Sequence, residues 1–261
     1  MTTQGQGQHI ENRCAAPTHG IHISEQEETA YDISNRIAAR TNKAVFPQQK
    51  ARGRFSYQTL FMLFMLGSIA GFLIEGVCHI FKAGFWENHS AVVWGPFCII
   101  YGVGAVAVYA FSCCLTAQGW VRKFLVFTFS GAAIEYIASL FQEVCFGSVS
   151  WDYSGHFLNI GGRVSLQMAL FWGILGLLFM EIIFPLVNRV LCRVQGKTLT
   201  VACTILSIFM AINLIVTVAA LTRWKQRQND IPAVSVIGTV LDTHFSDEIM
   251  TELYPNMRFQ Q

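Results

Sequence analysis

The chain has 261 residues, of which 53% are hydrophobic and 13% are charged, and its formal net charge is +2 at pH 7. Soluble domains carry about 25% charged residues, so this composition excludes an ordinary soluble protein. The small net charge also excludes the broad basic surface of a nucleic-acid-binding protein. Apolar runs of the roughly 20 residues that cross a bilayer recur along the chain. The sequence therefore predicts an all-α, polytopic transmembrane helical bundle.

The chain divides into three regions by composition. Residues 1–54 predict a polar N-terminal tail, residues 55–222 a transmembrane helical domain, and residues 223–261 a polar C-terminal tail. Within the domain the apolar runs predict about five membrane helices, at 57–81, 92–114, 121–146, 164–190 and 199–221. Lys and Arg are more numerous near the predicted helix ends that share a side with the N-terminus. This bias favours a multi-pass protein of the cell (plasma) membrane with a cytoplasmic N-terminus.

A short motif occurs twice in the predicted helices. Gly71-Phe-Leu-Ile-Glu75 lies in the first helix, and Gly131-Ala-Ala-Ile-Glu135 lies in the third. Each motif is followed by a loop with a tryptophan and an acidic residue, and then by another apolar helix. The pattern fits a duplicated two-helix unit, and parallel repeats of this kind build some transporters. Chance recurrence of so short a motif stays open as the alternative.

Four glutamates lie inside the predicted spans, at positions 75, 135, 143 and 181. A carboxylate in hydrocarbon is costly and faces a partner or a wet cavity. Steps of three or four residues place small and polar side chains on the faces that carry Glu75 and Glu135. The polar members of these faces include His79, Ser139 and Gln142. Two interpretations stay open: a substrate path with Glu75 and Glu135 at its centre, or a structural polar core.

The densest polar cluster follows the third predicted helix, in the 150–163 loop, Ser-Trp-Asp-Tyr-Ser-Gly-His-Phe-Leu-Asn-Ile-Gly-Gly-Arg. Asp152 and Arg163 are its only formal charges. An ion pair between them is the simpler interpretation, and an Arg163 that points into the bundle toward Glu135 is the other. The remaining candidate residues of this outer-loop motif are Trp151, Tyr153, Ser154, Asn159 and Gly162.

The sequence predicts no catalytic residues, no metal site and no cofactor. Gly196-Lys197-Thr198 resembles the end of a phosphate-binding loop, but position 191 is leucine where that motif requires its first glycine. The seven histidines form no recognised ligand spacing. A lipid-active enzyme with Asp152 or Glu135 as its base is therefore the weakest of the hypotheses, and we expect a protein that is not an enzyme.

Several motifs between Gly71 and Pro185 occur together in a recognisable order. They are Glu75, Gly95-Pro96-Phe97-Cys98 with Tyr101-Gly102, Glu135-Tyr136, Trp151-Asp152-Tyr153-Ser154, Asn159 with Gly162-Arg163, Trp172-Gly173 and Pro185. In order and spacing this segment resembles the bacterial membrane family of putative ABC-transporter type IV permeases, CmpB-like. The chain departs from that pattern at Asn88-His89-Ser90, where the family has a basic Asn-Arg-Gly, so a role that needs this arginine does not carry over.

The resemblance implies a permease-like membrane subunit that moves an unknown solute with a separate nucleotide-binding subunit. The lipid bilayer and a homo-oligomer are the other expected partners, and no nucleic acid is expected. The alternative is a non-transporting sensor or assembly protein that recognises an envelope component through the 150–163 loop.

Overall fold

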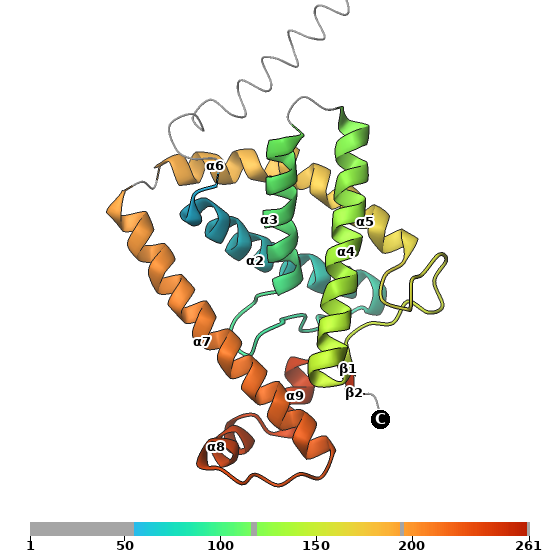
Figure 1. Ribbon diagram of the computed structural model, residues 1–261, viewed down its shortest axis with the longest axis vertical. Helices are drawn as coiled ribbons and strands as arrows, with labels where there is room; N and C mark the ends of the chain where they lie inside the picture. Colours follow the sequence, from blue (N-terminus) through green and yellow to red (C-terminus); the bar gives the residue numbers. More distant parts are fainter. Residues whose placement is uncertain (1–54, 116–118, 194–195, 260–261) are drawn as a thin grey trace, which may run out of the picture. The chain divides into compact units, whose positions relative to one another are not determined.

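The structure is a computed structural model that describes residues 55–115, 119–193 and 196–259. In these residues the chain is almost wholly helical (Figure 1). Its elements are α2 (Tyr57–Ala83), α3 (Ile99–Cys114), α4 (Trp120–Phe146), β1 (Ser148–Val149), α5 (Leu166–Leu178), η1 (Phe179–Ile183), α6 (Phe184–Arg193), α7 (Lys197–Gln228), α8 (Val236–His244), α9 (Asp247–Leu253) and β2 (Arg258–Phe259). Strands β1 and β2 pair antiparallel. The predicted tail at 1–54 lies outside the described residues.

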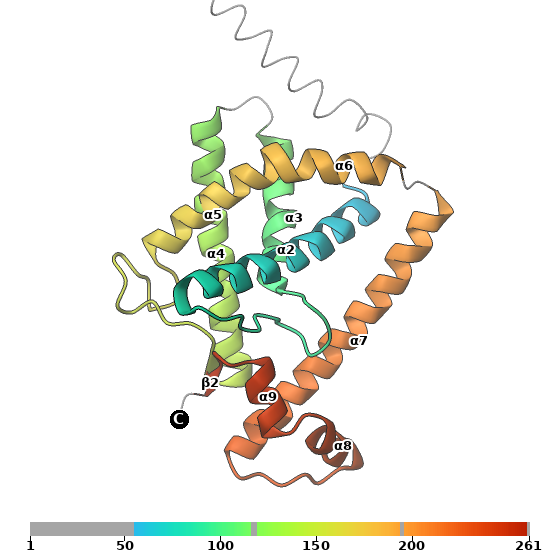
Figure 2. The same cartoon turned by 180° about the vertical axis from the view of Figure 1, so that it is seen from behind.

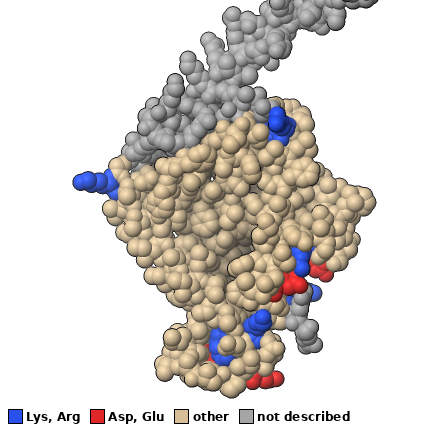
Figure 3. All heavy atoms as spheres, viewed as in Figure 1, with Lys and Arg blue, Asp and Glu red and all other residues tan. Residues whose placement is uncertain are grey.

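Among the described residues, four helical segments are long and apolar enough to cross a membrane: 57–83, 120–146, 166–189 and 197–228. Helix α3 has 16 residues and is about 24 Å long, which is shorter than the hydrocarbon core. In Figure 3 the charged side chains lie near the upper and lower parts of the visible face, and the broad surface between them is uncharged. These features confirm the predicted all-α membrane fold.

The second helix starts later than predicted. It begins at Ile99 rather than at position 92, because Gly95 adopts a left-handed φ of 85° and Pro96 has no backbone N–H to donate. Residues 92–98 instead form a loop that packs against α7. Asn213 of α7 accepts from the backbone N–H of Trp94 at 3.2 Å and donates to its carbonyl at 2.7 Å. The hydropathy of the sequence reveals the apolar run, but it does not reveal that a side chain of α7 supports this loop.

Helices α2 and α3 pack closely because α2 carries glycines at the contact. A Cβ atom on Gly67 would lie 2.6 Å from the Cβ of Ala105, and one on Gly71 would overlap the ring of Tyr101. Helices α4 and α5 meet in the same way, since a Cβ on Gly131 would overlap Trp172. Small residues that let helix backbones approach are a common basis of packing in membranes.

The predicted fourth helix is a nearly continuous rod of α5, η1 and α6 (Figure 2). It begins after Ser165, whose side chain accepts from the backbone N–H of Met168 at 3.4 Å. The π-helical turn η1 is closed by the N–H of Phe184, which donates to the carbonyl of Phe179. Pro185 explains its position, because proline offers no N–H to the carbonyl of Glu181 four residues earlier.

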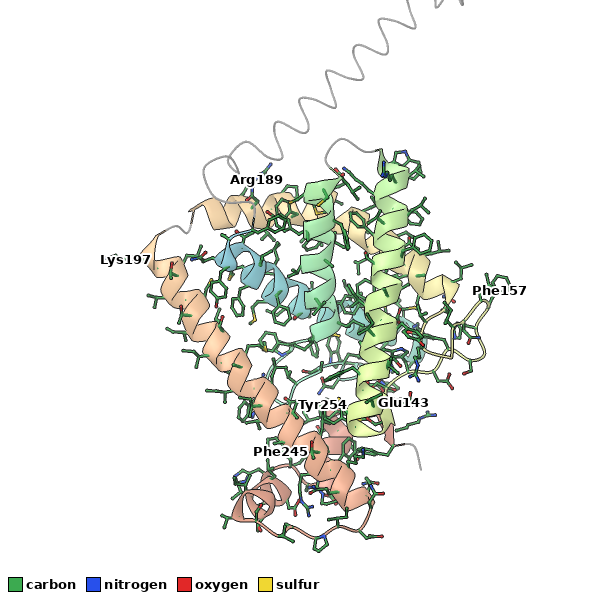
Figure 4. The ribbon with its side chains drawn as sticks, viewed as in Figure 1. Glu143, Phe157, Arg189, Lys197, Phe245 and Tyr254 are labelled. Atoms are coloured by element: carbon green, nitrogen blue, oxygen red, sulfur yellow. The ribbon has the colours of Figure 1, made fainter. Side chains whose placement is uncertain are left out.

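The C-terminal region differs from the predicted polar tail. Helix α7 continues to Gln228, and α8 and α9 follow it. Arg223 donates from Nε and Nη2 to the two carboxylate oxygens of Asp242, at 2.8 and 2.9 Å. Trp224 and Tyr254 pack in one apolar cluster with Phe146 of α4, and Figure 4 shows Tyr254 between the lower parts of α4 and α7. This region is therefore held by an ion pair between its polar residues and by an apolar cluster with α4.

Candidate functional site

Glu135 is the buried carboxyl group at the centre of the bundle. It lies in the middle of α4 and its residue is 4% exposed. The hydroxyl of Tyr153, from the 150–163 loop, donates to its Oε1 at 2.9 Å. The indole nitrogen of Trp172, from α5, donates to its Oε2 at 3.2 Å. Both carboxylate oxygens are thus held by donors from neighbouring segments, as a buried acidic group requires.

Glu75 has an equivalent partner on the neighbouring helix. The hydroxyl of Tyr101, on α3, donates to Glu75 Oε1 at 2.5 Å. The rings of Tyr101 and Trp172 lie 5.0 Å apart between centroids. Glu75, Tyr101, Trp172, Glu135 and Tyr153 therefore form a chain of contacts across α2, α3, α5, α4 and the loop, which we call the two-glutamate network.

Tyr153 joins this network to the loop. Burial raises the pKa of its phenol, and the negative charges of Glu135 and Glu75 raise that pKa further. The phenol therefore stays protonated at neutral pH. Because an ionised carboxylate can only accept, the hydroxyl of Tyr153 is the donor in its bond to Glu135. The 150–163 loop thus contributes a donor to the membrane helices, and does not only connect them.

The two halves of the network are built alike. In each half a glutamate lies four residues after a glycine, as Gly71–Glu75 and Gly131–Glu135. The next helix places an aromatic side chain over that glycine. The same aromatic side chain, Tyr101 or Trp172, donates to the glutamate. This correspondence of contacts agrees with the duplicated two-helix unit that the sequence motif suggests.

Asp152 serves the 150–163 loop itself. Its Oδ1 accepts from the hydroxyl and the backbone N–H of Ser154, at 2.6 and 2.8 Å. These bonds lower the pKa of the Asp152 carboxyl group. A Cβ on Gly162 would lie 2.6 Å from the same oxygen, and Gly162 has a φ of 67°. Only glycine fits both the backbone conformation and the close approach at this position.

Further bonds close the loop on itself. Asn159 donates to the carbonyls of Ser154 and His156, at 3.1 and 3.0 Å, and accepts from the N–H of Gly162 at 3.1 Å. The indole nitrogen of Trp151 donates to the carbonyl of Arg163 at 2.9 Å. The motif residues of the loop thus share one task, which is to hold a fixed loop conformation beside Glu135.

Arg163 pairs with neither of the two acids that the sequence suggested. It forms an ion pair with Glu143 of α4, donates to the hydroxyl of Ser139 at 3.4 Å, and lies over the ring of Tyr136. The expected pairs with Asp152 and with Glu135 are therefore replaced by a pair with Glu143. The cause is the path of the loop, which returns Arg163 to the C-terminal turns of α4.

The remaining predicted site residues lie apart from the network. Gln142 donates to the hydroxyl groups of Ser148 and Ser150, at 3.3 and 2.8 Å. Glu181 lies 3.7 Å from Lys123. His79 lies beside Glu87, at the end of α2. Sequence reasoning missed Tyr101 and Trp172 as partners of the glutamates, although both belong to the motifs of the family resemblance.

A small apolar cavity adjoins the network. Its volume is about 40 Å³, and its lining includes Gly71, Tyr101, Trp172 and Phe179. About 10–15 Å³ of such volume holds one water molecule, so the cavity has room for only a few. Within the network Glu135 is buried, whereas Glu75 is partly exposed.

Comparison with known protein families gives a match over most of the described helices. A sequence model of the family described as "Putative ABC-transporter type IV" matches residues 62–218. This range contains both glutamates, both aromatic donors and the whole 150–163 loop. No curated protein and no solved structure gives a significant match.

Proposed function

We propose, because this chain belongs to the putative ABC-transporter type IV family, that it is the membrane subunit of a transport system and acts with a separate nucleotide-binding subunit. The chain is a membrane protein of a transporter-type family. On this proposal it is not itself an enzyme, and the partner subunit hydrolyses ATP. The solute path runs past the two-glutamate network.

The observation that carries the proposal is the placement of two carboxyl groups inside membrane helices. Ionisable groups at such positions are expensive and usually mark a pathway for ions or substrates. Glu75 and Glu135 belong to different helix pairs, and the contact between Tyr101 and Trp172 connects them. A shift of one pair relative to the other would separate these rings and uncover the buried carboxyl group of Glu135. The network therefore has the form of a gate.

The test uses the full chain purified in mild detergent from its native host. We expect a nucleotide-binding subunit to copurify and to hydrolyse ATP when the complex is reconstituted in proteoliposomes. The double variant Glu75→Gln with Glu135→Gln should keep the partner but reduce hydrolysis to the rate of the isolated nucleotide-binding subunit. Glu181→Gln, which removes an exposed carboxylate, is the matched control. Unchanged hydrolysis in the double variant would contradict the role of the network.

A second function has support from the tip of the 150–163 loop. Phe157 is 77% exposed and Leu158 is 62% exposed, and Figure 4 shows Phe157 pointing away from the helices. An exposed apolar tip on a fixed loop fits a sensor or assembly protein that docks on an envelope component. The variant Phe157→Ser would then release that component, and no ATP-hydrolysing subunit would copurify with the parent protein.

A further inference from the structure

Three metal-ligating side chains meet where α2 ends. His79 lies in the last turns of α2, and Glu87 and His89 lie in the loop that follows. One possible ligand atom from each lies within 4.8 Å of the others. Their side chains are 15–21% exposed, so an ion could reach them from solvent. None of the three takes part in the two-glutamate network.

The distances in this cluster suit a metal ion better than a direct hydrogen bond. His79 Nδ1 and His89 Nε2 each lie 3.4 Å from the same oxygen, Glu87 Oε1. A charge-assisted N–H···O bond is about 2.7–2.9 Å long. Ligands bound to zinc at about 2.0–2.1 Å in a tetrahedron lie about 3.3–3.4 Å from one another. The two separations from Glu87 Oε1 therefore match the edges of a zinc coordination shell, and the third pair of ligand atoms lies within 4.8 Å.

The tautomer of His89 supports the same reading. Its Nδ1 lies 3.0 Å from the backbone carbonyl oxygen of Glu87, and a carbonyl can only accept, so Nδ1 carries the proton. In the neutral ring Nε2 then presents a lone pair toward a carboxylate oxygen. Two acceptors that face each other repel unless a cation lies between them. A histidine that donates one N–H to a carbonyl and offers its other nitrogen is the usual metal ligand.

Neighbouring residues hold the ligands in position. Asn256, from the segment after α9, donates to Glu87 Oε1 at 2.5 Å. Asn88 accepts from the backbone N–H of Ser90 at 2.9 Å and so fixes the turn between Glu87 and His89. Among the described residues, no atom hydrogen-bonds the buried Nε2 of His79. The polar contact that this imidazole makes in the described residues is therefore the one from Nδ1 to Glu87.

We propose that His79, Glu87 and His89 bind a divalent transition-metal ion of the zinc class, with a fourth coordination position open to water or another ligand. Two imidazoles and one carboxylate are a common three-ligand set for such ions. Because Asn256 orients Glu87, the bound ion ties the end of α2 to the C-terminal segment. The alternative explanation is that no metal binds and that His89 takes up a proton instead. His89 would then be the cation of a simple ion pair with Glu87.

The experiment uses the full chain in detergent, with His9, His19 and His22 replaced by glutamine so that no histidine of the first 54 residues competes. Metal-free protein is titrated with Co²⁺, followed by its visible absorption, and then with Zn²⁺ against a chromophoric chelator. We expect one equivalent of each ion to bind, and Zn²⁺ to displace Co²⁺. Asn256→Ala should weaken binding about 10–100-fold, as loss of a ligand-orienting bond does.

Variants of the cluster decide the assignment. The double variant His79→Gln with His89→Gln should lose the tight site, whereas His244→Gln, in α8, should bind as the parent does. Melting in the presence of chelator shows whether each variant folds, and Zn²⁺ should raise the melting temperature of the parent but not of the double variant. Absence of binding in the parent, or equal binding in the double variant, overturns the proposal. The proposal is also overturned if the melting temperature of the parent changes with pH but not with Zn²⁺. That result would show that His89 pairs with Glu87 as a protonated imidazole.

Discussion

Arg163 of the 150–163 loop forms an ion pair with Glu143, two helical turns beyond Glu135 on α4. Both side chains are partly shielded, at 18% and 30% exposure. The pair fixes the end of the loop on the same helix that carries the buried carboxyl group. Tyr153 of that loop then reaches Glu135. The charge pair at the surface thus positions a donor in the interior.

A double-mutant cycle of Arg163→Gln and Glu143→Gln tests this role. We expect each single variant to lower the free energy of unfolding, and the pair to show a coupling of about 1 kcal/mol, within the range for residues in direct contact. Asp152→Asn should show no coupling to Arg163→Gln, because Asp152 bonds to Ser154 instead. Equilibrium unfolding in detergent measures all three. Coupling of Arg163 to Asp152 but not to Glu143 would contradict the structure.

The glycines under the aromatic donors should tolerate no side chain. We expect Gly71→Ala and Gly131→Ala to destabilise the bundle by about 1–3 kcal/mol each, because the added methyl group overlaps Tyr101 or Trp172 and overpacking costs that much. Gly155→Ala is the control, since nothing lies within 4 Å of the position of its Cβ. Thermal unfolding of the purified variants is the measurement. Equal melting of all three would show that the contacts are looser than described.

The loop at 92–98 should depend on Asn213. We expect Asn213→Leu to destabilise the protein by about 1–3 kcal/mol, because it leaves the part-buried N–H and carbonyl of Trp94 without their partner. Thr204→Ala, an exposed substitution on the same helix, should stay within about 0.5 kcal/mol of the parent. Hydrogen exchange at residues 92–98 measures the effect locally. If both variants exchange like the parent, α7 does not hold this loop.

The C-terminal region should loosen in acid. The bond from Arg223 holds the pKa of Asp242 below its usual value, which is about 3.9 in an unfolded chain. A lowered folded-state pKa contributes stability that is complete above the unfolded pKa and is lost as the pH falls through the folded pKa. We therefore expect protection of α8 against hydrogen exchange to fall on acidification below about pH 4. In Asp242→Asn this step should be missing, and its persistence would assign the acid response to another carboxyl group.

Local signals in the chain predicted most of the helices. The runs at 57–81 and 121–146 appear within a few residues as α2 and α4, because length and apolarity are properties of a continuous segment. The prediction of a helix at 92–114 was wrong at its start, because Gly95 and Pro96 interrupt the helix. Both residues are visible in the sequence, but the support from Asn213 of α7, more than 100 residues away, is not.

The sequence by itself determined that this is an all-α membrane protein, and that two glutamates follow glycines on matching helix faces. Hydropathy, periodicity and spacing are local, so they can be read along the chain. Only the tertiary structure decided which side chains meet. It paired Arg163 with Glu143, gave Glu75 and Glu135 their aromatic donors, and brought His79 to Glu87 and His89. Such contacts depend on the path of each loop and on how closely helices approach, and no single segment encodes either.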